Sequence, residues 1–204
     1  MCKIIAITDS SIVKGSFLTR VEEICQSGVY GLILREKGAS DEAYEWLARK
    51  VMPICERYST RLILHEHVWA AMRLKHPYLH VSMDTLMGMQ GKERRAFWML
   101  GASCHSQGEV RKAICAGATY VTLSPIFETT CKPEAIPLGL EALAQTVGMA
   151  TVPVIALGGI SDKNVGSIRK NGAEGIAVRG AYMTCENVEE LTHMLQEKWR
   201  ESAL

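Results

Sequence analysis

The 204-residue sequence has almost no excess charge of either sign, because 23 basic residues are balanced by 22 acidic ones and the formal net charge is +1. The two signs are interspersed along the chain. The sequence therefore contains no basic stretch of the kind that binds nucleic acid or an anionic membrane surface. We expect neither nucleic acid nor a membrane as a partner.

The sequence also has no CxxC pair and no long apolar run. Its seven cysteines are an odd number spread singly over the chain, which is typical of reduced thiols in the cytosol. The first segment, MCKIIAITDS, has an apolar stretch too short for a signal peptide or a membrane span. We expect a cytoplasmic protein whose 48% apolar residues bury one core, as a single domain over residues 1–204.

Short apolar segments alternate with longer segments of helical periodicity. The apolar segments are continuous, as expected for strands buried on both faces, and they lie at 3–9, 31–35, 61–65, 78–82, 99–104, 120–124, 154–159 and 175–178. The amphipathic segments lie at 16–27, 41–57, 67–75, 89–96, 106–116, 138–147, 162–171 and 187–199. This alternation predicts an α/β fold, a closed (β/α)8 TIM barrel. A doubly wound open sheet is the competing architecture.

One joint between helix and strand recurs almost literally, in CQSGVYGLIL (25–34), CAGATYVTL (115–123) and KNGAEGIAV (170–178). In each case we expect a helix to end at a glycine, namely Gly28, Gly117 or Gly172. Glycine enters the left-handed conformation that ends a helix without a Cβ clash. The repetition supports a chain built from βα units.

Two neighbouring strand ends carry glycines and a cation. The segment ALGGIS (156–161) contains Gly158 and Gly159 before an expected helix, and AVRGAY (177–182) contains Arg179 and Gly180. Backbone N–H groups at a helix N-terminus bind phosphate, and the seventh and eighth loops form the usual phosphate site of a TIM barrel. We therefore predict a phosphate site here. The alternative is a tight turn beside a solvated arginine.

The second strand ends in LREKG (34–38), where Arg35 and Lys37 are two residues apart. If the strand geometry continues, both side chains point the same way and suit a diphosphate or a carboxylate. The alternative is an exposed loop before the helix that begins near Asp41.

Four segments in this order give the chain a family resemblance: LREKG (34–38), GASCHS (101–106), SPIFETTCK (124–132) and ALGGIS (156–161). With them the sequence resembles the thiamine phosphate synthase/TenI family over nearly its whole length. The resemblance implies a (β/α)8 barrel in thiamine biosynthesis. Synthases of this family join a hydroxymethylpyrimidine diphosphate to a thiazole phosphate with the help of Mg²⁺, whereas TenI proteins isomerise a thiazole carboxylate phosphate by moving a proton.

The resemblance also implies roles for individual residues, all in binding a small-molecule phosphate or diphosphate substrate. Arg35 and Lys37 match a diphosphate-binding pair, and Ser103 matches a serine that contacts pyrophosphate. The substrate-holding loop of the family is matched by Thr129 and Lys132. At the predicted phosphate site, Gly159 matches a glycine that contacts the thiazole phosphate, while Gly180 stands where the family has a serine.

The metal positions depart from the family pattern. Glu66 stands where the family has a magnesium-binding aspartate, and Thr85 aligns with the second aspartate unless a shift of one residue brings in Asp84. Glu66 and Asp84 are therefore the candidate ligands for Mg²⁺. A separate hypothesis places zinc or another transition metal on His65 and His67, with Asp84 or His105 as a further ligand.

The candidate for proton transfer is His105, which follows the fifth strand. Some TenI proteins use a histidine after the sixth strand, where this chain has Pro125. His105 is the nearest substitute, although a histidine satisfied by backbone groups is the alternative. We expect a TenI-like enzyme acting on a thiazole phosphate; a thiamine phosphate synthase and a non-catalytic phosphate binder are the alternatives. A homo-oligomer fits all three.

Overall fold

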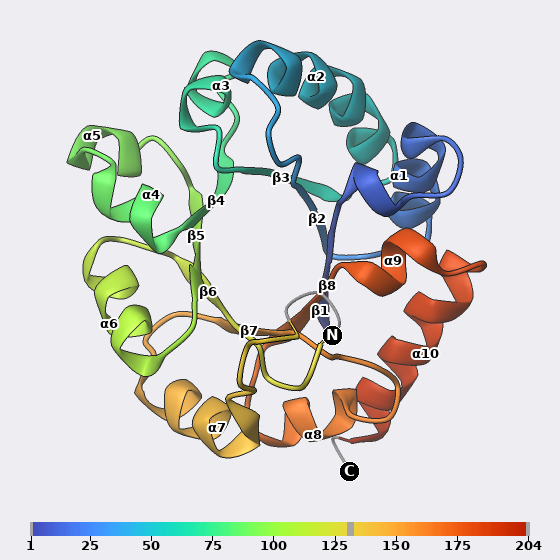
Figure 1. Ribbon diagram of the computed structural model, residues 1–204, viewed down its shortest axis with the longest axis vertical. Coiled ribbons are helices and arrows are strands. Elements are labelled where there is room, and N and C mark those ends of the chain that lie inside the picture. The colour runs from blue at the N-terminus through green and yellow to red at the C-terminus, as the bar shows by residue number, and fades with distance from the viewer. Residues whose placement is uncertain (1, 130–132, 203–204) are drawn as a thin grey trace.

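The barrel is closed by eight parallel strands that follow one another in sequence order, and β8 pairs again with β1 (Figure 1). The computed structural model describes residues 2–129 and 133–202. The strands are β1 Lys3–Ile7, β2 Gly31–Leu34, β3 Arg61–His65, β4 Tyr78–Ser82, β5 Met99–Cys104, β6 Tyr120–Leu123, β7 Val154–Leu157 and β8 Gly175–Val178. The predicted (β/α)8 barrel is confirmed.

The helices form a ring around the barrel (Figure 1). They are η1 Ser10–Ile12, a 3-10 helix, followed by α1 Phe17–Gln26, α2 Asp41–Arg57, α3 Val68–Arg73, α4 Met83–Gly88, α5 Gly91–Arg94, α6 Gln107–Cys115, α7 Gly139–Met149, α8 Val165–Lys170, α9 Gly180–Thr184 and α10 Val188–Glu201. Ser40 and Ser106 begin α2 and α6, since each hydroxyl accepts a backbone N–H three residues later. Across the described ranges, no helix is long and apolar enough to span a membrane.

Three α-helices of the described residues differ from the sequence-based expectation, and the 3-10 helix η1 was not predicted either. The predicted helix 89–96 shrinks to the four residues of α5. Before it, α4 begins directly after β4, because the Ser82 hydroxyl accepts the Thr85 N–H and caps a turn. The short helix α9 follows β8 in the same direct way and opens at Gly180. Both unpredicted helices are too short to show clear periodicity.

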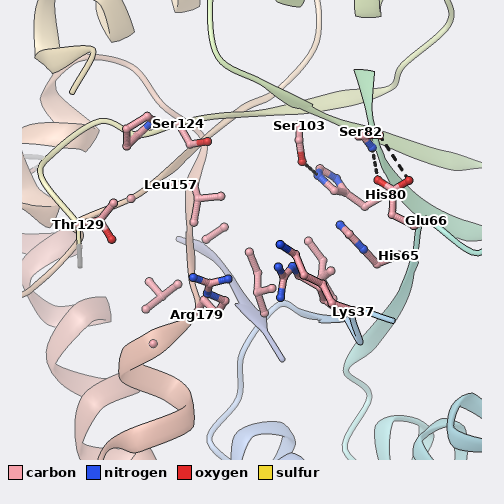
Figure 2. Close-up of a pocket in the computed structure, with 18 of the residues that line it drawn as sticks. Lys37, His65, Glu66, His80, Ser82, Ser103, Ser124, Thr129, Leu157 and Arg179 are labelled. Carbon is pink, nitrogen blue, oxygen red and sulfur yellow. Dashed lines mark hydrogen bonds between the residues drawn. The ribbon is translucent and has the colours of Figure 1, made fainter. Parts of the chain in front are cut away.

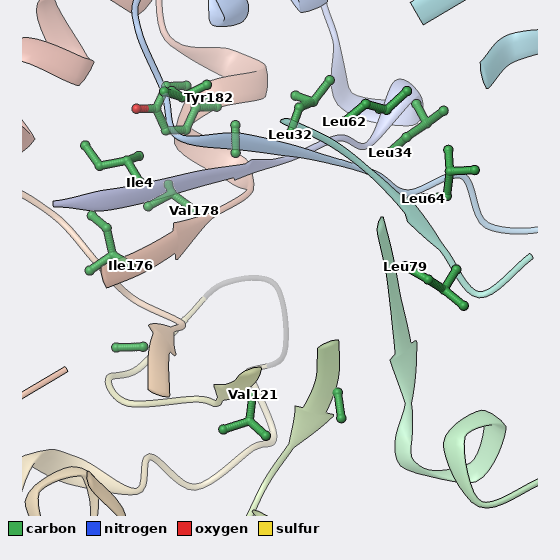
Figure 3. Packing of buried hydrophobic residues seen from close by; sticks show 14 of the residues in the cluster. Ile4, Leu32, Leu34, Leu62, Leu64, Leu79, Val121, Ile176, Val178 and Tyr182 are labelled. Atoms are coloured by element: carbon green, nitrogen blue, oxygen red, sulfur yellow. The ribbon is translucent and has the colours of Figure 1, made fainter. Parts of the chain in front are cut away.

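Each strand buries both of its faces, which explains the continuous apolar runs. Leu32 and Leu34 point outward to the helices in the large cluster of Figure 3, whereas Ile33 between them points into the barrel. The inner cluster consists of Ile5, Ile7, Ile33, Ile63, Tyr120, Ile155 and Ala177. The barrel interior is thus a packed core that supports the loops above it.

Glycines set the ends of several elements. Gly28, Gly117 and Gly172 have φ values of 80°, 96° and 84° at the three recurring joints, as expected. Gly158 and Gly159 have φ values of 101° and 66°, so they leave extended geometry and end β7 earlier than the sequence predicted.

Candidate active site

A cavity of about 680 Å³ opens at the carboxyl end of the barrel, within the size range of small-molecule sites. Its walls are the strand ends and the loops that follow them (Figure 2). Its apolar part includes Ile7, Ile33, Leu157 and Ala177, side chains that belong to or pack against the inner core cluster. The cavity therefore combines an apolar surface with a polar rim.

Most of the predicted site residues gather around this cavity. Those that line it are Arg35, Lys37, Glu66, Ser103, His105, Thr129, Gly158, Gly159, Arg179 and Gly180. Lys132 lies outside the described residues. Asp84 is exposed in the first turn of α4 and is not part of the lining. The structure therefore does not bring Asp84 to Glu66, because β4 ends at Ser82 and the helix begins at once.

Two arginines share one carboxylate at the rim. Arg35 Nη1 and Arg179 Nη1 each lie 3.5 Å from the same oxygen, Asp9 Oδ2. Both side chains are largely buried. Asp9, directly after β1, holds the two guanidinium groups on one side of the cavity, where they attract an anion. The sequence analysis missed Asp9, although its position at a strand end was a signal.

Gly158 and Gly159, called the glycine corner below, join two loops. A Cβ on Gly159 would lie 2.2 Å from the Glu128 carbonyl oxygen, and one on Gly158 would lie 2.8 Å from Pro125 Cα. The glycines therefore pack the loop after β7 against the loop after β6, in addition to lining the cavity. The helix α8 begins only at Val165, so it does not start directly after Gly159. The helix that starts beside the cavity is α9, which begins at Gly180.

The carboxylate of Glu66 is engaged by neighbouring donors. It accepts hydrogen bonds from the N–H and the hydroxyl of Ser82 (Figure 2) and from the hydroxyl of Thr85. Mg²⁺ prefers several hard oxygen ligands in octahedral geometry. Of the two carboxylates that the family resemblance implies as ligands, only Glu66 lines the cavity, and it is already engaged, so this pair does not fit a magnesium site.

The histidines beside Glu66 have other partners. His67 Nδ1 lies 2.6 Å from Asp41 Oδ1, and the His67 ring stacks on Tyr44 at 3.9 Å. Burial lowers the pKa of His65 to about 4. Over residues 2–129 and 133–202, no three His, Cys, Asp or Glu side chains are grouped so as to hold a metal. The His65–His67 metal hypothesis thus gains no third ligand there.

His105 is anchored to the loop after β6. Its Nδ1 lies 2.7 Å from the Ser124 carbonyl oxygen, which means that Nδ1 carries the proton and donates it. In the neutral ring Nε2 is then the acceptor. The backbone contact is the one expected of a structural histidine, and the residue also lines the cavity.

A further histidine lies inside the barrel, and the sequence analysis did not single it out. His80 on β4 contacts Ser103 Oγ through Nε2 and the Tyr120 hydroxyl through Nδ1, both at 2.9 Å. Burial lowers its pKa to about 3, so its ring is neutral. The only signal in the sequence was a histidine within the apolar strand YLHVS.

The chain is similar to known proteins over most of its length. A family model described as thiamine monophosphate synthase matches residues 4–182. A protein of Aquifex aeolicus named putative thiamine-phosphate synthase 2 is 34% identical over 175 residues, which cover 86% of this chain and 94% of the relative. The thiamine-phosphate synthase of Lysinibacillus sphaericus is 34% identical over 178 residues, which cover 85% and 84%.

The fold has a solved counterpart. The structure titled thiamine phosphate pyrophosphorylase from Pyrococcus furiosus superposes with a TM-score of 0.84 at 24% identity, covering 98% of this chain and 96% of that chain. The family model itself extends from β1 into α9 and so includes every strand of the barrel. The chain therefore belongs to the thiamine phosphate synthase/TenI family, a family of thiamine-biosynthesis enzymes.

Proposed function

We propose that the chain is a thiamine phosphate synthase, which joins hydroxymethylpyrimidine diphosphate to a thiazole phosphate and releases pyrophosphate. One observation carries the proposal: Arg35, Lys37 and Arg179 line a single cavity together with the glycine corner. Two anionic substrates need such an extended set of cations and N–H donors, whereas isomerisation of one thiazole phosphate needs only part of it. The synthase names of the relatives support this choice over the TenI-like reaction that the sequence favoured.

In this reaction the C–O bond to the diphosphate breaks, and its electron pair leaves with pyrophosphate. The thiazole nitrogen then donates its lone pair to the pyrimidine methylene carbon. Arg35, Lys37 and the Ser103 hydroxyl are suited to hold the departing pyrophosphate, since charged and polar donors stabilise developing negative charge. Arg179 and the N–H of Gly180 are suited to hold the thiazole phosphate.

In the proposed reaction, Arg35 and Lys37 neutralise negative charge on the leaving pyrophosphate. Mg²⁺ assists the reaction in the family, but Glu66 is the only carboxylate of the predicted metal pair at the cavity. The assay is therefore run with and without added Mg²⁺, so that it also measures the contribution of Mg²⁺ that binds together with the diphosphate.

The decisive assay incubates the chain with both precursors and measures thiamine phosphate and pyrophosphate. We expect one pyrophosphate for each thiamine phosphate, and Lys37→Ala should lower the rate. Lys112→Ala removes the same charge from an exposed position of α6 and should leave the rate unchanged. Absence of product under every condition refutes the proposal.

A TenI-like isomerisation is the second candidate, because His105 lines the cavity with Nδ1 tied to the Ser124 carbonyl. Proton exchange of a thiazole carboxylate phosphate in D₂O measures this reaction, and His105→Ala should slow it. If the chain binds pyrophosphate but gives neither coupling nor exchange, it is a non-catalytic binder.

A further inference from the structure

Three neighbouring strands contribute a chain of hydrogen bonds to the barrel interior. Ser103 on β5 contacts His80 on β4, and His80 contacts Tyr120 on β6, each over 2.9 Å (Figure 2 shows the contact of Ser103 with His80). Ser103 and His80 line the cavity, whereas Tyr120 lies below them in the inner core. The chain thus runs from the core to the cavity wall.

The backbone is shaped around these side chains. A Cβ at Gly101 on β5 would lie 2.2 Å from Tyr120 Cζ and 2.3 Å from His80 Nδ1. No side chain fits at that position unless the two rings separate. The rings of His80 and Tyr120 therefore fill the space that a side chain at position 101 of β5 would otherwise occupy.

The burial of Tyr120 sets the direction of the hydrogen bonds. Its hydroxyl has one partner within the described part of the chain, His80 Nδ1. A buried hydroxyl proton without an acceptor is costly, so the phenol donates to Nδ1. Because His80 is neutral, its proton is then on Nε2 and is donated to Ser103 Oγ.

We propose that Tyr120 and His80 are positioning residues that aim the Ser103 hydroxyl proton into the cavity, toward an anionic oxygen of the substrate. The inference rests on the proposed function for the identity of that anion, a diphosphate. The direction is opposite to that of a serine nucleophile, whose hydroxyl donates to a histidine base. Ser103 is therefore a donor to the leaving group and forms no covalent intermediate.

The first test measures the tautomer in the unmodified chain. Long-range ¹H–¹⁵N spectra of protein labelled with ¹⁵N-histidine distinguish the two neutral forms of the ring. We expect the Nε2–H form for His80 in the native chain and a mixture in Tyr120→Phe. The Nδ1–H form in the native chain overturns the proposal.

The second test is a double-mutant cycle with inorganic pyrophosphate as the probe, followed by calorimetry. We expect Tyr120→Phe to weaken pyrophosphate binding about fivefold in the native background, as the loss of one hydrogen-bonding partner does. In a Ser103→Ala background the same change should have less than about a twofold effect, since the positioned hydroxyl is gone. Equal factors in both backgrounds, or no effect in either, overturn the proposal.

Two matched variants separate this role from a structural one. Tyr182→Phe removes another fully buried phenol, which contacts Thr192 and is not among the residues that line the cavity, and should leave pyrophosphate binding unchanged. His80→Gln keeps an N–H donor for Ser103 and should bind pyrophosphate within about threefold of the native chain, whereas His80→Leu should lose about tenfold. Equal losses in both His80 variants count against the proposal.

The binding assay contains neither thiamine precursor, so it is independent of turnover. If the native chain binds pyrophosphate with the expected cycle but makes no thiamine phosphate, the synthase proposal fails and the positioning role stands. If the native chain binds no pyrophosphate, or if a fluorophosphonate labels Ser103, the positioning role fails.

Discussion

Lowering the pH from 7.5 to 4.5 is expected to destabilise the folded chain through His80. The residue is only 2% exposed, and both of its ring nitrogens contact neutral hydroxyls. Burial lowers its pKa from 6.5 to about 3. Between these values the unfolded chain binds a proton that the folded chain excludes, so this contribution to stability is complete above pH 6.5 and is lost as the pH falls.

The size of the effect follows from the shift. One pH unit within this window changes the free energy of unfolding by about 1.4 kcal/mol for each such group. Integrated from pH 7.5 to 4.5, the loss for His80 is about 3 kcal/mol. A typical domain has about 5–15 kcal/mol of stability in total. The change is therefore large enough to measure by urea denaturation.

Comparison of two variants isolates the contribution of His80 from that of the carboxylates. Urea unfolding curves at both pH values give the free energy lost by the native chain and by His80→Gln, whose amide does not titrate. We expect the variant to lose about 3 kcal/mol less. His193→Gln changes an exposed histidine of α10 and should lose as much as the native chain. Equal losses in native chain and His80→Gln would refute the assignment of a buried neutral ring.

The other predictions use unfolding measurements and calorimetry on further variants. Burial lowers the pKa of His65 to about 4, so His65→Gln should remove about 2–3 kcal/mol of the acid-induced loss in the same urea experiment. Gly101→Ala should cost about 1–3 kcal/mol in denaturant unfolding through steric overlap with His80 and Tyr120, and unchanged stability would contradict that overlap. Arg179→Ala should weaken binding of phosphate ligands by about tenfold or more at unchanged Tm, measured by calorimetry beside Lys112→Ala.

The fold was predictable because its signals are local. Strands that are buried on both faces give continuous apolar runs, and the glycines at the recurring joints mark helix ends. The two α-helices that the sequence missed within the described residues, α4 and α9, have six and five residues. Such short helices form through caps and contacts with the neighbouring structure, which periodicity does not report.

The site was predictable where it depends on strand ends. All parallel strands of a barrel point their carboxyl ends to one side, so Arg35, Lys37 and Arg179 had to converge. The contact between His80 and Tyr120 was not predictable in this way. It depends on the register of β4, β5 and β6, which brings together residues 40 positions apart. Asp84 was misplaced for a similar reason, because the point where α4 begins decides which way its carboxylate faces.

The polar side chains His80 and Ser103 come from the neighbouring strands β4 and β5, and their position affects how the cavity binds an anion. Isoleucines from β1, β2, β3 and β7 form much of the inner core, whereas β4 and β5 present His80 and Ser103 at the cavity. The cations come from the loops after β2 and β8. An anion in this cavity meets cations from the loops after β2 and β8, and the neutral His80 and Ser103 side chains on β4 and β5. Because His80 stays neutral down to about pH 3, the polar side offers hydrogen bonds without adding positive charge to the site. In the proposed synthase reaction, the Ser103 hydroxyl and the cations therefore contact the leaving pyrophosphate from different strand ends of the barrel, and both stabilise its developing negative charge.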